Sequence, residues 1–169
     1  MTRTAAALSA ARPVILGLTA LNAFYALCLL ALLVFSFTIS GWPARPLGFE
    51  MTHAHPWVGT GLRLIVAIAI VGAAVVHTVL RRLLAIVDTV RAGDPFAEDN
   101  ARRLEQIAWR VLALEGLRMV VSRIAAVVWE PGHVDAFSFT PWLAVLLLFV
   151  LAGVFSHGAR MHADLEGTV

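Results

Sequence analysis

The sequence is poor in charged residues, contains no lysine and has a single cysteine. Charged residues make up 14% of the 169 residues, whereas soluble globular domains average about 25%. Such a composition argues against an ordinary cytosolic enzyme and against an intrinsically disordered chain. The lone Cys28 excludes an intramolecular disulfide and a cysteine-based zinc site, and its place in an apolar run is typical of a small hydrophobic residue.

Apolar residues are abundant instead, at 60% of the chain, which indicates an integral membrane protein. All 13 basic residues are arginines, and against 11 acidic residues they leave a formal net charge of only +2. This small excess does not predict direct binding to nucleic acid. The positions of the arginines along the chain are more informative than their number.

Four apolar segments are long enough to cross a bilayer, which takes about 20 helical residues. The first contains no Asp, Glu, Arg, Lys or His and is too long for the apolar region of a signal peptide, and Pro13 suits its first helical turn. The third is less clean, because Arg110, Glu115, Arg118 and Arg123 interrupt it. We therefore predict one all-α membrane domain over residues 1–169, a bundle of four transmembrane helices in two hairpins, with spans at about residues 13–40, 62–82, 107–129 and 139–157.

The arginines also predict the orientation of the spans. They gather before the first span, between the second and third, and after the fourth, whereas the loops 41–61 and 130–138 hold only Arg45. Short arginine-rich segments stay cytoplasmic, which predicts a multi-pass protein of the bacterial inner membrane with both termini inside. Tryptophans at the predicted outer ends agree with this, because indole rings favour the headgroup level: Trp42, Trp57, Trp129 and Trp142.

Between the second and third spans, helical periodicity continues beyond the expected membrane boundary. Gly93 fits the position just past a helix end, Asp94 the N-cap of the next helix and Pro95 its first position. The pattern predicts a cytoplasmic helical hairpin over residues 83–106 that leaves the membrane by about 15 Å. Its charged outer face is either merely solvated or a surface that binds a partner, and both interpretations stay open.

Two separated stretches resemble one protein family. Residues 91–104, RAGDPFAEDNARRL, look like the signature of domain-of-unknown-function family 2975, and residues 153–169, GVFSHGARMHADLEGTV, resemble the tail of that family. The resemblance implies a small bacterial four-helix membrane protein without an established activity. It is similar to proteins often encoded beside a small helix-turn-helix transcription regulator, which suggests a membrane partner that captures or controls such a regulator.

The residues expected to bind a partner lie in the hairpin and in the cytoplasmic tail, residues 158–169. They comprise the signature positions, their charged neighbours and the acidic end of the chain: Gly93, Asp94, Pro95, Phe96, Glu98, Asn100, Arg102, Arg103, Leu104, Asp164, Leu165, Glu166 and Val169. The acidic pair Asp164 and Glu166 has the charge needed to dock on the arginine-rich base of the hairpin.

Polar residues inside the expected spans form a second set of candidates, because charges within a membrane are costly. Glu115 and Arg118 are spaced to pair on one helix face that continues to Ser122. This face is either a structural ion pair or the lining of a path for a solute. The remaining members are Asn22, expected to make an interhelical hydrogen bond; His77 and His157, at a shared depth near the inner leaflet; and Arg123, near the outer interface.

No catalytic motif, cofactor-binding motif or metal site is evident in the sequence. His53 and His55 have only Glu50 nearby as a further ligand. We therefore expect no enzymatic activity and no cofactor. The first functional hypothesis is regulation through a cytoplasmic partner such as a small DNA-binding regulator. The alternative is a transporter or channel subunit that uses the Glu115–Arg118–Ser122 face, and a homo-oligomer is compatible with either.

Overall fold

The computed structural model describes residues 3–39, 42, 57–128 and 139–166. These residues form no strands and four helices: α1 (Arg3–Thr38), α3 (Val58–Arg91), α4 (Glu98–Val128) and α5 (Thr140–Glu166). Helices α1, α3 and α5 are long and apolar enough to cross a membrane. The all-α fold predicted from the sequence is therefore confirmed for the described residues, and three helices are compatible with a membrane protein. Helix α4 carries too many charges to qualify by composition.

Helix α1 begins earlier than the sequence pattern indicated. It starts at Arg3, so Pro13 lies inside the helix and not in its first turn, and that prediction was wrong. The stretch before Pro13 is rich in alanine, the residue with the highest helix propensity, which extends the helix towards the N-terminus. Because proline has no N–H, it cannot make the usual hydrogen bond to the carbonyl one turn earlier.

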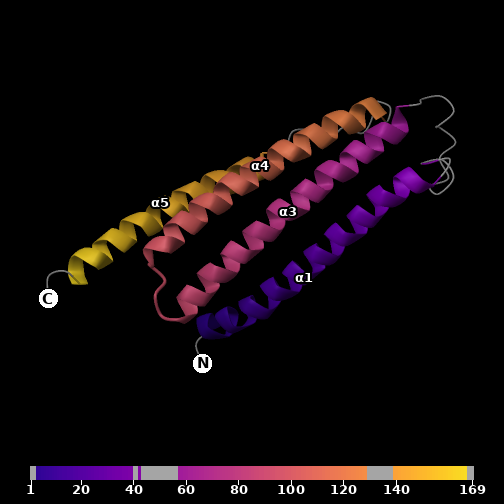
Figure 1. The fold of residues 1–169 in the computed structure, drawn as a ribbon. Helices are drawn as coiled ribbons and strands as arrows, with labels where there is room; N and C mark the ends of the chain where they lie inside the picture. The colour runs from indigo at the N-terminus through magenta and orange to yellow at the C-terminus, as the bar shows by residue number, and fades with distance from the viewer. Residues whose placement is uncertain (1–2, 40–41, 43–56, 129–138, 167–169) are drawn as a thin grey trace.

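The four helices lie side by side in chain order, and each runs antiparallel to the next (Figure 1). The extensive contacts are between successive helices, α1 with α3, α3 with α4 and α4 with α5. The start of α1, the end of α5 and the connection between α3 and α4 lie at one end of the array, which we call the turn end. The opposite end, where α1 finishes and α3 starts, we call the far end.

The outermost helices α1 and α5 expose large apolar side chains along their length. Leu21 and Phe24 of α1 are 62% and 64% exposed, and Leu147 of α5 is 60% exposed. So large an apolar surface is unfavourable in water but is the surface that lipid chains solvate. The arrangement of the helices therefore agrees with the composition in indicating a membrane protein.

Helix α4 supplies much of the buried core, because it packs between α3 and α5. Its buried residues Ala101, Leu104 and Ala108 recur at helical spacing, and Ile107 lies beside them. The same stripe continues to Glu115, which is 5% exposed. The charged residues of α4 make it too polar to count as a membrane span by composition. Some of them are nevertheless enclosed between α3 and α5.

Polar contacts also join α1 to α3. Asn22 donates from Nδ2 to the carbonyl of Ala73 at 3.0 Å, the interhelical hydrogen bond expected from the sequence. Nearer the turn end, Arg12 Nε lies 3.2 Å from Asp88 Oδ1. Both of these charged side chains are about half exposed, so the ion pair contributes little to stability unless a membrane interface desolvates it.

Candidate functional site

The α3–α4 turn begins with a helix ending that requires glycine. Gly93 has a φ of +93°, the conformation that its place after the helix end predicted. Its N–H donates to the carbonyl of Val90 at 3.2 Å, and the N–H of Asp94 donates to the carbonyl of Thr89 at 3.2 Å. This pair of hydrogen bonds is the Schellman motif, which satisfies carbonyls left open at a helix C-terminus.

Helix α4 starts later than the sequence indicated. It begins at Glu98, so Asp94 is not its N-cap and Pro95 is not its first residue, and both predictions were wrong. The physical reason lies in Asn100, whose backbone N–H bonds the carbonyl of Ala97 at 2.8 Å and whose side chain bonds the carbonyl of Pro95 at 3.2 Å. These bonds hold residues 94–97 as a turn outside the helix.

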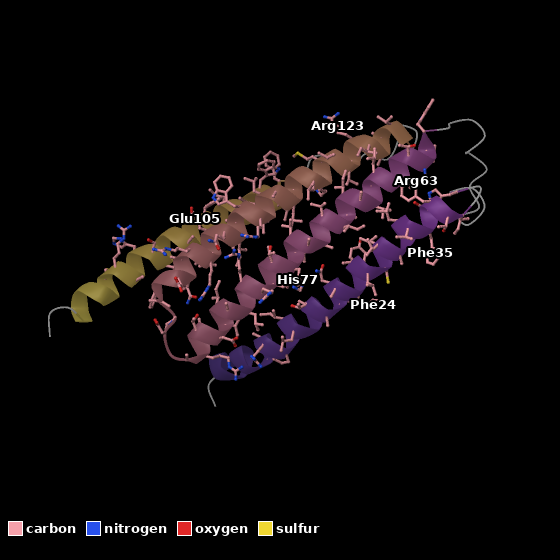
Figure 2. All side chains as sticks on the ribbon, in the orientation of Figure 1. Phe24, Phe35, Arg63, His77, Glu105 and Arg123 are labelled. Atoms are coloured by element: carbon pink, nitrogen blue, oxygen red, sulfur yellow. The ribbon has the colours of Figure 1, made fainter. Side chains whose placement is uncertain are left out.

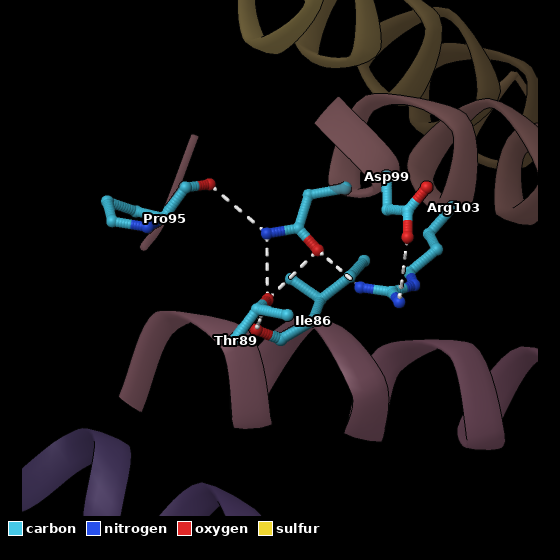
Figure 3. Close-up of polar contacts among 6 residues, drawn as sticks. Ile86, Thr89, Pro95, Asp99 and Arg103 are labelled. Atoms are coloured by element: carbon cyan, nitrogen blue, oxygen red, sulfur yellow. Dashed lines mark hydrogen bonds and ion pairs between the residues drawn. The ribbon is translucent and has the colours of Figure 1, made fainter. Parts of the chain in front are cut away.

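Asn100 is the centre of a polar network that joins Thr89 of α3, Pro95 of the turn and Arg103 of α4 (Figure 3). Its side chain is fully buried. Besides the bond to Pro95, Nδ2 donates to Thr89 Oγ1 at 2.8 Å, and Oδ1 accepts from Arg103 Nη1 at 2.9 Å. Because an unpaired buried amide is costly, these bonds specify the register between the ends of α3 and α4.

Arg103 extends this network towards the surface. Its Nη2 lies 3.6 Å from Asp99 Oδ2, one turn earlier on α4. The Asp99 side chain is 68% exposed, whereas that of Arg103 is 26% exposed. Arg103 is therefore mainly a structural residue of the turn, and Asp99 faces solvent or the headgroup region.

Phe96 connects the turn to α5. Its ring centroid lies 5.7 Å from that of Phe155, and its ring covers Gly158. A Cβ atom at position 158 would lie 2.9 Å from two atoms of the Phe96 ring, closer than real contacts allow. Of the predicted partner-binding residues, Asn100 and Leu104 are thus buried inside the turn end, with Leu104 only 7% exposed, whereas Phe96 packs against α5 but remains 43% exposed.

Other members of the predicted partner-binding set do lie on the surface. Asp94 and Arg102 are exposed, as are their charged neighbours Arg91 and Glu105. All four of these exposed charged residues lie in or near the α3–α4 turn, and we call them the turn surface. The remaining predicted residues fall outside the described side chains: Glu98, Asp164, Leu165, Glu166 and Val169.

The Glu115–Arg118 pair forms as the sequence spacing predicted. Arg118 donates from Nε to both carboxylate oxygens, at 3.1 and 3.0 Å, and from Nη2 to Oε1 at 2.7 Å. Ser122, the third residue of this predicted face, is half-buried, and Arg123 is exposed towards the far end of α4 (Figure 2). The Glu115 carboxylate thus accepts three hydrogen bonds from Arg118 on the same helix. It is therefore better suited to a structural role than to binding a solute.

The other interruption of the expected third span, Arg110, links α4 to α3. Its Nε donates to Thr78 Oγ1 at 2.9 Å, and its Nη1 donates to the carbonyl of Gln106 at 3.1 Å. Together with the Asn100 network it places two polar connections between the central helices, both in the half of the array nearer the turn end.

The two histidines of the expected spans lie on different helices. His77 is half-buried on α3, and His157 is exposed on α5, beside Phe96 and Met161. Among the described residues, no group of three histidine, cysteine, aspartate or glutamate residues is placed to hold a metal ion. His53 and His55 lie outside the described residues.

Arg63, a charged residue near the start of the second apolar segment, was not among the residues predicted from the sequence. Its Nη2 donates to the carbonyl of Ser36 at 2.7 Å, its Nε donates to Ser36 Oγ at 3.3 Å, and its guanidinium lies 4.7 Å from the centre of the Phe37 ring. A cation suits this place, because the last carbonyls of α1 carry partial negative charge. Its signal in the sequence was a single charge at the edge of an apolar run.

Comparison with known proteins identifies the family but not an activity. No curated protein and no solved structure matches the chain. A family model described as "Protein of unknown function (DUF2975)" matches residues 4–169, which is essentially the whole chain. That match includes both stretches whose resemblance was noted in the sequence, residues 91–104 and 153–169. The chain therefore belongs to the DUF2975 family of proteins of unknown function.

Proposed function

We propose that this protein spans the bacterial inner membrane four times, with α4 as the additional span and the turn end in the cytoplasm. The antiparallel packing of α4 between α3 and α5 supports the fourth span, because two neighbours and the Glu115–Arg118 pair reduce the cost of its charges. The arginines around the α3–α4 turn support the orientation. Trp57 and Trp142, at the far end, are then near the outer headgroups.

We further propose that the turn surface binds a cytoplasmic protein, such as a small helix-turn-helix transcription regulator, and that the role is regulatory and not enzymatic. The observation that carries this proposal is the contrast within the turn. Asn100 is buried and hydrogen-bonded and Phe96 packs against α5, while Arg91, Asp94, Arg102 and Glu105 are exposed at the same end.

The hydrogen bonds of Asn100 hold the turn that carries these charged side chains. Such an arrangement favours binding, because less conformational entropy is lost when a partner docks. Charged residues at the edge of such an interface act mainly on specificity and on the rate of association. The charges of the turn surface have both signs, so the expected partner surface also has mixed charge. The Glu115–Arg118–Ser122 face gives the transport alternative less support, since its carboxylate is already bound by Arg118.

The test is affinity purification of the tagged full-length protein from native membranes, followed by identification of the proteins that co-purify. The informative variant is Arg91→Glu/Arg102→Glu, which reverses charge on the turn surface without replacing a member of the Asn100 network. Arg123→Glu is the matched control, because it reverses an exposed charge on α4 towards the far end. A topology reporter on each variant verifies that the orientation is unchanged.

We expect a small DNA-binding protein to co-purify with the wild type and with Arg123→Glu. It should be absent from the purification of Arg91→Glu/Arg102→Glu. Equal recovery with all three would show that the turn surface is not the binding site. Recovery of nothing except the protein itself would contradict the regulatory proposal and favour a self-contained oligomer.

A further inference from the structure

A groove of about 680 Å³ runs along α5 at the turn end. Phe96 forms one wall, and Val150, Val154 and Met161 supply most of the remaining apolar lining. Its volume is within the range of about 300–1,000 Å³ that is usual for small-molecule sites. The turn surface is charged, whereas this groove is apolar. A ligand of the groove is therefore expected to be apolar, unlike a protein that binds the turn surface.

Two glycines make the groove hollow, each in a different way. Gly158 lies under the Phe96 ring and allows the turn to approach α5. Gly153 has no atom within 4 Å of the position where a Cβ would be, so it opens onto empty space in the groove. A larger residue at position 153 would therefore fill the groove without a collision with the protein.

The groove extends across the expected membrane boundary of α5. From Val150 to Met161 it covers about 16 Å of helix, at 1.5 Å per residue. Its Val150 end lies within the expected span 139–157, and its Met161 end lies beyond it. His157 lines the groove near that boundary, and Arg160 is exposed on the same face of α5 as Gly153 and His157 by helical spacing.

We propose that this groove binds one acyl chain of an anionic phospholipid, whose phosphate contacts Arg160 and His157. Arginine is well suited to a phosphate, and an apolar groove at hydrocarbon depth is well suited to an acyl chain. By helical spacing the groove continues into the exposed apolar face of α5 that includes Leu146 and Leu147. A helix of a cytoplasmic protein would instead have to enter the hydrocarbon to reach Val150. The inference rests on the proposed membrane insertion and not on the proposed partner.

The test uses the full-length protein in nanodiscs with equal amounts of phosphatidylglycerol and phosphatidylcholine, followed by native mass spectrometry of the lipids that remain bound. Gly153→Leu fills the groove, and Arg160→Gln removes the charge for the phosphate. Ala144→Leu is the matched control, because it enlarges an exposed small residue elsewhere on α5. Thermal unfolding of each variant verifies that it is folded.

We expect the wild type and Ala144→Leu to retain phosphatidylglycerol in preference to phosphatidylcholine, and Gly153→Leu to retain neither. Arg160→Gln should lower the ratio of retained phosphatidylglycerol to phosphatidylcholine about fivefold, as expected for one arginine near an anionic surface. Unchanged retention in Gly153→Leu, or an unchanged ratio in Arg160→Gln, would overturn the proposal. A wild-type dimer that Gly153→Leu dissociates would identify a second copy as the occupant and would also overturn it. Partner capture by Arg160→Gln is measured separately, so failure of the lipid site is distinguishable from failure of the proposed function.

Discussion

The ring of Phe96 covers Gly158 so closely that a Cβ on the glycine would lie 2.9 Å from two ring atoms. This contact joins the α3–α4 turn to α5. It also joins the two stretches that resemble the family signature, residues 91–104 and 153–169, which are far apart in the sequence. The hairpin and the start of the tail are therefore parts of one structural unit.

Substitution of Gly158 should weaken this unit. In Gly158→Leu the new side chain would displace the Phe96 ring, and overpacking of this kind costs about 1–3 kcal/mol of unfolding free energy. Reversible unfolding in mixed detergent micelles measures the loss. Gly153→Ala is the control, because its Cβ meets open space and alanine favours helix over glycine by roughly 1 kcal/mol. Equal destabilisation by both variants would contradict the importance of the Phe96 contact.

Asn100→Leu should destabilise the turn more than its small change in volume suggests. The variant removes the buried amide that bonds Thr89, Pro95 and Arg103, and loss of such bonds leaves buried groups unsatisfied at about 1–3 kcal/mol. Hydrogen exchange of the amides in residues 86–100 should accelerate in the same variant. Gln106→Leu, at an exposed position of α4, should change neither quantity, and unchanged exchange in Asn100→Leu would refute the role of the network.

The Glu115–Arg118 pair should behave as a coupled structural element. Glu115→Leu and Arg118→Leu each break the pair and should be destabilising, while the double variant should recover part of the loss, with a coupling energy of about 1–3 kcal/mol. Unfolding free energies of the four proteins in a double-mutant cycle measure it. Additive effects would argue against coupling. A solute flux that Glu115→Gln abolishes without loss of stability would support the transport alternative instead.

Arg63→Gln should loosen the far end of the α1–α3 pair. It removes the charged donor to the carbonyl and hydroxyl of Ser36 and the contact with the Phe37 ring, which should lower the unfolding free energy by about 1 kcal/mol. The separation of spin labels on α1 and α3 near Ser36 should become broader. Arg123→Gln, an exposed arginine of α4 towards the same end, should leave that distance unchanged. A narrow distance distribution in both variants would exclude the proposed role of Arg63.

Several features were readable from the sequence because they depend on local chemistry. The apolar composition indicated a membrane protein, and the periodicity indicated helices. Gly93 was correctly placed after a helix end, because a positive φ is cheap only for glycine. The spacing of Glu115 and Arg118 was sufficient to predict their pairing, since residues three apart on a helix are neighbours.

Other predictions failed where residues outside the short motif outweighed the residue types within it. Asp94 and Pro95 have the residue types of a helix start, but the buried Asn100 side chain bonds the Pro95 carbonyl and α4 begins at Glu98. Pro13 was assigned to a first turn, but the alanines before it extend the helix. Arg63 was not predicted because the carbonyl that it bonds, that of Ser36, lies at the end of another helix, α1.

The sequence by itself determined that this chain is helical, apolar and divided into antiparallel segments, because hydropathy and helix propensity act on neighbouring residues. Only the tertiary structure decided which polar residues face inward. It buried Asn100 within the turn end, packed the partly exposed Phe96 against α5, left Asp94 and Arg102 outside, and opened the groove beside Gly153. Burial depends on which helix packs against which, and those contacts join residues that are far apart along the chain.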